Sequence, residues 1–220
     1  MVNNVSPSIR HLLLATLLTL SPFATAGIAY DTITGDALSG GAGGLGGVLQ
    51  AGQQVTLDPS SSNVVVKFEV GLRLFPGGSE SETFQIHFLA LDGPGGDPGS
   101  VLWSSTNQAF GTSTGTNQIF EFFPPSIVVP QTFVWVMEPT DDDPISDPSN
   151  ILIGNSSVGA SVGTAGPLWQ QNAVGGAWID LNAAPRLARV TTAEAAVPGP
   201  LPLALMAIAA ALLLGIRTRS

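Results

Sequence analysis

The chain has 220 residues, of which only 10% are charged, and it contains 26 glycines and 17 prolines. Because Gly and Pro punctuate helices, this composition favours short strands joined by turns. All 16 acidic residues lie between Asp31 and Glu194, a region with only four basic residues. Such an acidic surface repels nucleic acid. The lack of cysteine excludes disulfides, thiolate metal sites, cysteine nucleophiles and the lipid anchor of a bacterial lipoprotein.

The first 26 residues have the three parts of a secretory signal peptide. Arg10 lies in a basic segment before an apolar run at 12–20. Ala24 and Ala26 fit the small-x-small pattern of a cleavage site, and cleavage would leave Gly27 first. The run is too short to span a membrane core of about 30 Å, which favours a cleaved signal helix over a retained anchor. We therefore expect export through Sec-type machinery and processing by signal peptidase.

Residues 27–196 are expected to form one all-β ectodomain whose first part, 27–47, is a Gly-rich lead-in. Apolar residues stand at every second position from Val64 to Leu74, and Val65 lies between them together with polar residues. This period of two predicts a strand with one buried side and one side, that of Val65, facing solvent.

A second segment, 84–90, repeats the alternation and places His87 on its solvent side. The Asp-, Gly- and Pro-rich cluster at 92–99 predicts a turn. Further strands are expected at 101–103, 119–123, 127–129, 133–137, 151–153 and around Trp169, Trp178 and Leu187. Many short strands with turns at near-regular spacing indicate a β-sandwich or a jelly roll.

The C-terminal 24 residues form a separate segment, in which a Pro-rich motif leads into an apolar run and a basic end. The motif and the basic residues are Val197, Pro198, Gly199, Pro200, Arg217 and Arg219. The apolar run at 203–216 predicts a transmembrane helix that, counted from Leu201, covers about 24 Å, less than a bilayer core. Snorkelling arginines and local thinning would close the gap. The positive-inside rule then leaves the ectodomain outside the cytoplasm, whereas the alternative is a buried helix of the domain.

This order of parts resembles the PEP-CTERM sorting signal and its Val-Pro-rich variants, although that family usually has Glu where Gly199 stands. The resemblance implies that residues 197–220 are a sorting and anchor tail, recognised by an exosortase-type membrane protease that cuts near the Pro motif. It also implies an exported protein of a Gram-negative bacterium, of a kind often associated with exopolysaccharide or biofilm.

Residues 84–103 resemble the sandwich ectodomains that often precede such signals, some of which are similar to carbohydrate-binding modules. Trp169 and Trp178 lie in a polar, Gly-rich region and are the candidates for stacking on sugar rings, because indole is large, flat and amphipathic. Trp103 and Trp135 lie in apolar strands. The alternative for all four tryptophans is core packing.

An acidic loop is the candidate metal site, with carboxylates at Asp141, Asp142, Asp143 and Asp147. Calcium takes six to eight oxygen ligands from flexible loops of this kind. The alternative is a solvated loop whose charges keep edge strands apart. Calcium is the cofactor that the loop would hold, and both interpretations stay open.

Catalysis has little support, because His87 is the one histidine of the mature domain and no Ser-His-Asp set stands out. We therefore predict a non-catalytic, membrane-sorted surface or extracellular-matrix protein associated with exopolysaccharide. It would be anchored at the inner membrane, transiently or stably, before it reaches the cell surface. The second interpretation is a carbohydrate-binding module displayed on the same anchor.

Overall fold

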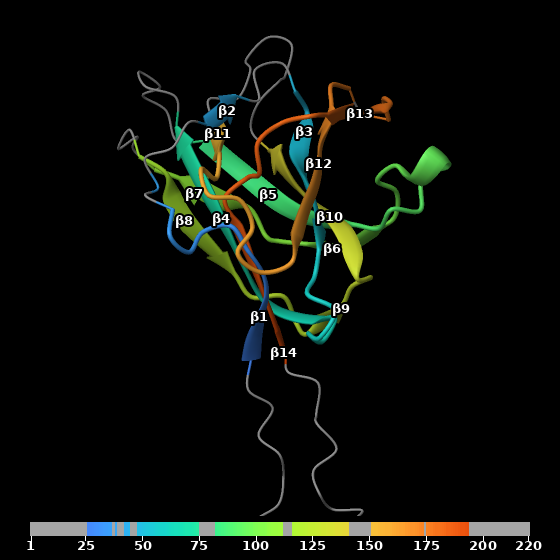
Figure 1. The fold of residues 1–220 in the computed structure, drawn as a ribbon. Helices are drawn as coiled ribbons and strands as arrows, with labels where there is room; N and C mark the ends of the chain where they lie inside the picture. The colour runs from blue at the N-terminus through green and yellow to red at the C-terminus, as the bar shows by residue number, and fades with distance from the viewer. Residues whose placement is uncertain are drawn as a thin grey trace, which may run out of the picture. The chain divides into compact units, whose positions relative to one another are not determined.

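The computed structural model describes residues 26–36, 38, 42–44, 48–74, 82–111, 116–140, 151–173 and 175–193. Within these ranges the chain forms 14 strands in two antiparallel sheets (Figure 1), which confirms the all-β prediction. A single 3₁₀ turn, η1 (Pro94–Gly96), lies in the loop predicted as a turn at 92–99. The predicted signal helix and transmembrane helix lie outside the described residues.

Sheet A is built around β4, its longest strand. Its strands are β1 (Ala26–Asp31), β14 (Ala188–Ala193), β4 (Val64–Leu74), β11 (Ile151–Gly154), β2 (Ala42–Gly44), β8 (Gln118–Phe122) and β9 (Ile127–Val128). Phe68, Glu69 and Val70 of β4 pair with both β14 and β8. Since a strand residue has one neighbour on each side, β8 lies opposite β14 and forms an edge of sheet A in the described part of the chain.

Sheet B is built around β3 and β10. Its strands are β13 (Trp178–Leu181), β12 (Thr164–Gln171), β3 (Gln50–Thr56), β10 (Thr132–Pro139), β5 (Glu82–Leu89), β6 (Val101–Ser104) and β7 (Gln108–Phe110). β5 pairs with β10 on one side and with β6 and β7 on the other. Among the described strands, β6 and β7 therefore form one edge of sheet B.

Aromatic side chains from both sheets interleave to form the core between them. Phe68 of sheet A contacts Phe88 and Trp135 of sheet B, with ring centroids 5.1 and 5.6 Å apart. Phe84 of sheet B meets Phe120 of sheet A edge to face at 5.2 Å. Each such pair contributes about 0.5–1.5 kcal/mol beyond the burial of its surface. These contacts show that the two sheets pack face to face as a sandwich.

The alternation predicted along β4 is interrupted near its start. Val65, expected to face solvent, is fully buried and belongs to the same core cluster as Phe68. The pairing of β4 with β14 shifts register between Thr191 and Thr192, and a bulge of this kind reverses the side on which neighbouring residues lie. The prediction for Val65 was therefore wrong, because a strand distant in sequence sets the bulge.

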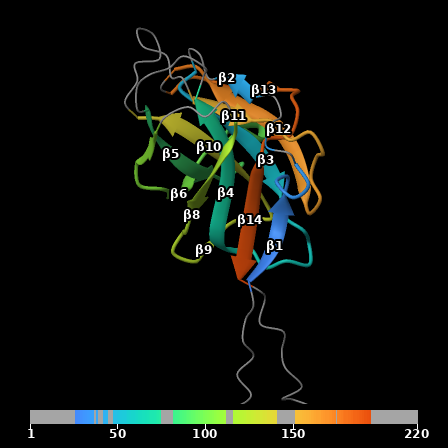
Figure 2. The same ribbon diagram turned by 90° about the vertical axis from the view of Figure 1, so that its left-hand side faces the viewer.

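The segment expected as a Gly-rich lead-in contributes two strands, β1 and β2, to sheet A. β1 pairs with β14 from Ala26 opposite Ala193 to Asp31 opposite Arg189. Figure 2 shows β1 and β14 side by side at one end of the sandwich. The first and the last described residues of the domain are thus neighbours, and the described parts of the lead-in belong to the sandwich.

Candidate functional site

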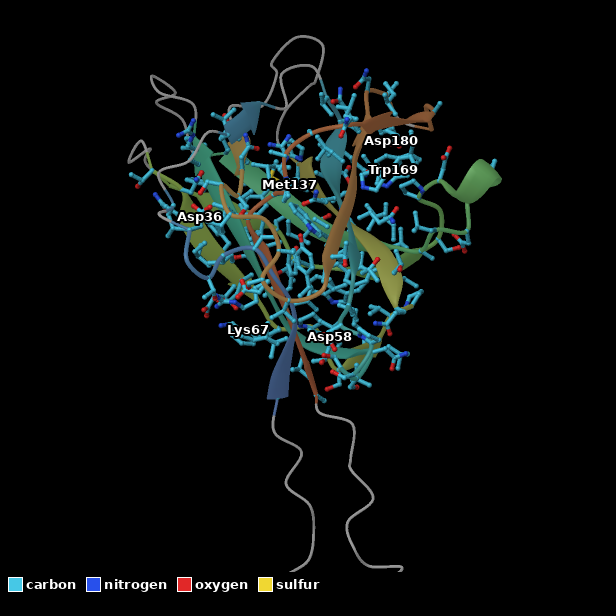
Figure 3. The ribbon with its side chains drawn as sticks, viewed as in Figure 1. Asp36, Asp58, Lys67, Met137, Trp169 and Asp180 are labelled. Atoms are coloured by element: carbon cyan, nitrogen blue, oxygen red, sulfur yellow. The ribbon has the colours of Figure 1, made fainter. Side chains whose placement is uncertain are left out.

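The two tryptophans predicted to stack on sugars lie on the outer face of sheet B, the face turned away from sheet A. They come from neighbouring strands, and the β12–β13 register sets Trp169 opposite Asp180 (Figure 3). Trp169 is 8% exposed and forms an outer cluster, which the partly exposed Trp178 joins, with Leu89, Val134 and Val136. The structure thus brings the two tryptophans together but covers most of Trp169, so Trp178 is the more accessible ring.

A glycine lies between Trp169 and β10 in sheet B. Gly52 of β3 is paired with Trp169 on one side and with Val136 on the other. A Cβ at Gly52 would lie 2.5 Å from the Cα atom of Val136 and closer still to the carbonyl oxygen of Trp135, so no larger residue fits without moving β10.

A chain of four polar side chains crosses the same face, from β3 through β10 and β5 to β6. Gln50 Nε2 donates to Glu138 Oε2 at 2.6 Å. The same carboxylate oxygen lies 3.0 Å from His87 Nε2, and His87 Nδ1 lies 2.8 Å from Ser104 Oγ. We call this set the polar chain. It links the centre of the sheet to its edge strand.

The polar chain fixes the ionisation of Glu138. Its hydrogen bond with His87 is the main cause that holds the pKa of this carboxyl below its usual range, and Gln50 adds to the effect against the cost of burial. His87 Nδ1 and Ser104 Oγ share one hydrogen bond, whose direction follows the tautomer of the ring. The polar chain therefore orients Ser104 on β6.

His87 was expected to be an ordinary surface residue, yet it is 8% exposed. The predicted face was correct: Phe88, the next residue in β5, points into the core, so His87 lies on the outer face. Its burial was missed because its partners Glu138 and Ser104 lie on other strands. Ser104, His87 and Glu138 form a line of hydroxyl, imidazole and carboxylate groups, as in a Ser-His-Asp triad. Nucleophilic catalysis also needs an oxyanion hole, in which hydrogen-bond donors converge on the reacting oxygen.

A second line of charged side chains, the charge ladder, crosses the outer face of sheet A. Arg189 Nε lies 3.2 Å from Asp31 Oδ1, and Arg189 Nη1 lies 3.4 Å from Glu69 Oε2. Lys67 Nζ continues the line, 3.3 Å from Glu69 and 2.7 Å from Glu121. The hydrogen bond to Glu121 is the largest cause of a raised pKa at Lys67. The charge ladder joins β1 to the edge strand β8 and ends at Glu121.

A pocket of about 320 Å³, the edge pocket, opens where the charge ladder ends. It lies between β8 and the β6–β7 connection, so the edges of both sheets form its walls. The ring centroids of Trp103 and Phe122 lie 6.5 Å apart, and these two residues supply a half-buried and a buried aromatic surface. The more exposed lining residues are Ser104, Thr106, Gln108, Glu121 and Phe123.

A second pocket, of about 380 Å³, lies beside β12 and β13 and is lined by Gln53, Asp180 and Asn182 among others. The buried Gln53 amide donates to the Gly166 carbonyl at 3.1 Å and accepts the Arg186 N–H at 2.7 Å. Gln53 therefore links β3 to β12 and to Arg186, which precedes β14. Its amide serves the fold, so this side of the pocket has a structural role.

The other predicted site residues fall in two groups. Ala26 and Gly27, at the predicted signal cleavage site, lie in β1. Ala24, the sorting motif at 197–200, Arg217, Arg219 and the predicted calcium loop at 141–147 lie outside the described residues. Within the described ranges, no three His, Asp or Glu side chains are grouped to hold a metal ion.

The same ranges contain no helix that is both long and apolar enough to cross a membrane. Comparison with protein-family models, with curated proteins and with solved structures finds no match to this chain.

Proposed function

We propose that this chain is an exported, non-catalytic surface protein whose sandwich is sorted at the membrane and acts in the exopolysaccharide matrix. The proposal includes an N-terminal signal helix within residues 1–26 and a C-terminal transmembrane helix at 203–216. The observation that carries it is the pairing of Ala26 with Ala193. Both predicted targeting segments join the sandwich at this one pair of neighbouring residues.

This pairing suits processing of the tail. The motif at 197–200 begins only a few residues after β14 ends at Ala193. A protease that cuts there would release the sandwich with β14 still paired to β1 and β4. The order of parts therefore permits release of a folded domain, as the resemblance to the PEP-CTERM signal implies.

The same pairing sets the order of events at the other end. The bond between Ala26 and Gly27 lies in β1, where the two residues pair with Ala193 and Thr192. Proteases bind their substrates as extended chain, so signal peptidase must act before β1 is paired. β14 is the last strand of the domain, so cleavage during export precedes the pairing.

The test is cell fractionation of three forms in the native host. We expect the full chain in the membrane and matrix fractions, and the form lacking 197–220 free in the periplasm or medium. The matched control keeps 203–220 but replaces Val197, Pro198, Gly199 and Pro200 by Ala. It should stay in the membrane if the motif is the cutting signal. A truncated form that is retained like the full chain contradicts the proposal.

A second candidate is a carbohydrate-binding module at Trp169 and Trp178, and the partly exposed Trp178 ring on the outer face favours it. Calcium binding at the loop 141–147, which lies outside the described residues, stays a prediction. Glycan binding that Trp178→Ala abolishes supports this candidate. Matrix retention without binding to any glycan leaves the first proposal alone.

A further inference from the structure

The edge pocket has an exposed aromatic wall. Phe123 is 69% exposed and is the one aromatic among the exposed large apolar side chains of the described residues. A single exposed apolar residue is ordinary on a protein surface, but this ring lines a pocket whose inner part holds two further aromatic side chains, Trp103 and Phe122. Burying such a wall against a ligand with an apolar face is favourable.

The backbone and a cation hold this ring in place. Phe123 precedes Pro124, and the residue before a proline is restricted to extended conformations. Lys67 Nζ lies 5.9 Å from the centroid of the Phe123 ring, a cation–π distance. The backbone at Phe123 is therefore restricted, and the contact with Lys67 favours one placement of the ring, which lowers the entropy that a ligand must overcome on binding.

The opposite wall is also fixed. Ser104 is held by His87 at 2.8 Å, through the polar chain. Ser105 Oγ accepts the Ile86 N–H at 3.0 Å and donates to the Thr106 carbonyl at 2.9 Å. The β6–β7 connection is thus tied to sheet B by side-chain hydrogen bonds, and the edge pocket is formed before a ligand arrives.

The polar groups of the pocket suit hydroxyl groups better than charged ones. Glu121 uses Oε1 to accept from Lys67, which leaves Oε2 to accept from a ligand. Thr106 and Gln108 add a hydroxyl and an amide on the facing side. Lys67 is already paired with Glu69 and Glu121, and the chain carries a net charge of −9, so an anionic ligand is repelled.

We propose that the edge pocket binds a neutral saccharide, with one pyranose ring against Phe123 and its hydroxyls hydrogen-bonded to Glu121, Thr106 and Gln108. A pyranose has an apolar C–H face that suits an aromatic ring and equatorial hydroxyls that both donate and accept. A volume of about 320 Å³ is at the lower end for small-ligand pockets. This inference rests on the proposed function, because it names neutral saccharides as the matrix component that the sandwich binds. Saccharide binding is tested separately from sorting.

The test is calorimetric titration of the full chain, kept soluble in a detergent without sugar headgroups. The probes are neutral hexasaccharides of glucose, mannose and galactose, and a hexagalacturonate. We expect at least one neutral probe to bind and the galacturonate to bind at least tenfold more weakly. No binding of any neutral probe at about 5 mM, a concentration that detects affinities weaker than millimolar, overturns the proposal.

Five variants assign the site. Phe123→Ala should weaken binding about tenfold, Phe123→Trp should retain it, and Glu121→Gln should weaken it severalfold. The matched control is Val128→Ala, because Val128 is 66% exposed on β9 of the same sheet, outside the pocket lining. Binding that survives Phe123→Ala and is lost in Trp178→Ala assigns the sugar to the outer face instead. A failure of cellular sorting leaves this titration unaffected, so the two proposals fail separately.

Discussion

Replacing Trp169 by Ala separates a structural role of this ring from a binding role. The indole is 8% exposed and lies in the outer cluster with Val134 and Val136, both fully buried, and with Leu89. Removing a buried Trp side chain costs about 3–5 kcal/mol. We take the lower end, about 3 kcal/mol, because the space opens toward solvent on an outer face and water can refill it. The indole N–H has no hydrogen-bond partner among the described residues, so no bond is lost.

The assay is thermal and urea unfolding of the full chain, followed by circular dichroism. For a domain of this size, about 3 kcal/mol lowers Tm by roughly 6–12 °C. Trp178→Ala, which truncates a partly exposed ring on the outermost strand of sheet B, should cost about 1 kcal/mol or less. If Trp169→Ala melts with the wild type, the ring is not seated in the outer cluster and is free to contact a ligand. If Trp169→Ala loses glycan binding and Trp178→Ala keeps it, the loss reflects the lower stability of Trp169→Ala.

Two further predictions concern the polar chain and Gly52, the strand partner of Trp169. The lowered pKa of Glu138 means that its contribution to stability is present above the ordinary glutamate pKa of about 4.3 and is lost as pH falls through the lower folded value. Glu138→Gln should therefore be about 1 kcal/mol less stable at pH 7 and should approach the wild type in strong acid; a constant difference across the urea-melt pH series would contradict the assignment. Gly52→Ala should cost about 3 kcal/mol through overpacking against Val136, whereas Gly111→Ala, whose Cβ would meet no atom within 4 Å, should leave the urea midpoint almost unchanged.

Strand content could be predicted where one face is uniformly apolar. The segments that became β4 and β5 were predicted from their alternation, and the segment that became β10 was predicted from its continuous apolar run at 133–137. β3 was missed because its inward side carries Gln53, which is fully buried yet satisfied by the Gly166 carbonyl and the Arg186 N–H. A buried amide breaks the hydrophobic period, and the partners that make it tolerable lie far along the chain.

The candidate sites were harder to predict for the same reason. Trp178 was chosen from its polar surroundings, but the polar chain through His87 and the edge pocket at Phe123 depend on which strands become neighbours. Phe123 was expected to end an apolar strand, whereas the structure ends β8 at Phe122 and leaves Phe123 exposed. A shift of one residue at a strand end thus moves an aromatic ring from a predicted strand to a pocket wall.

The most direct test of export and sorting is the intact mass of the protein recovered from its native host. We predict a species that begins at Gly27 and ends between Pro198 and Pro200. A mass that still includes Arg219 would leave a plain membrane anchor in place of a sorting signal. A mass that begins at Met1 would contradict export through a cleaved signal peptide.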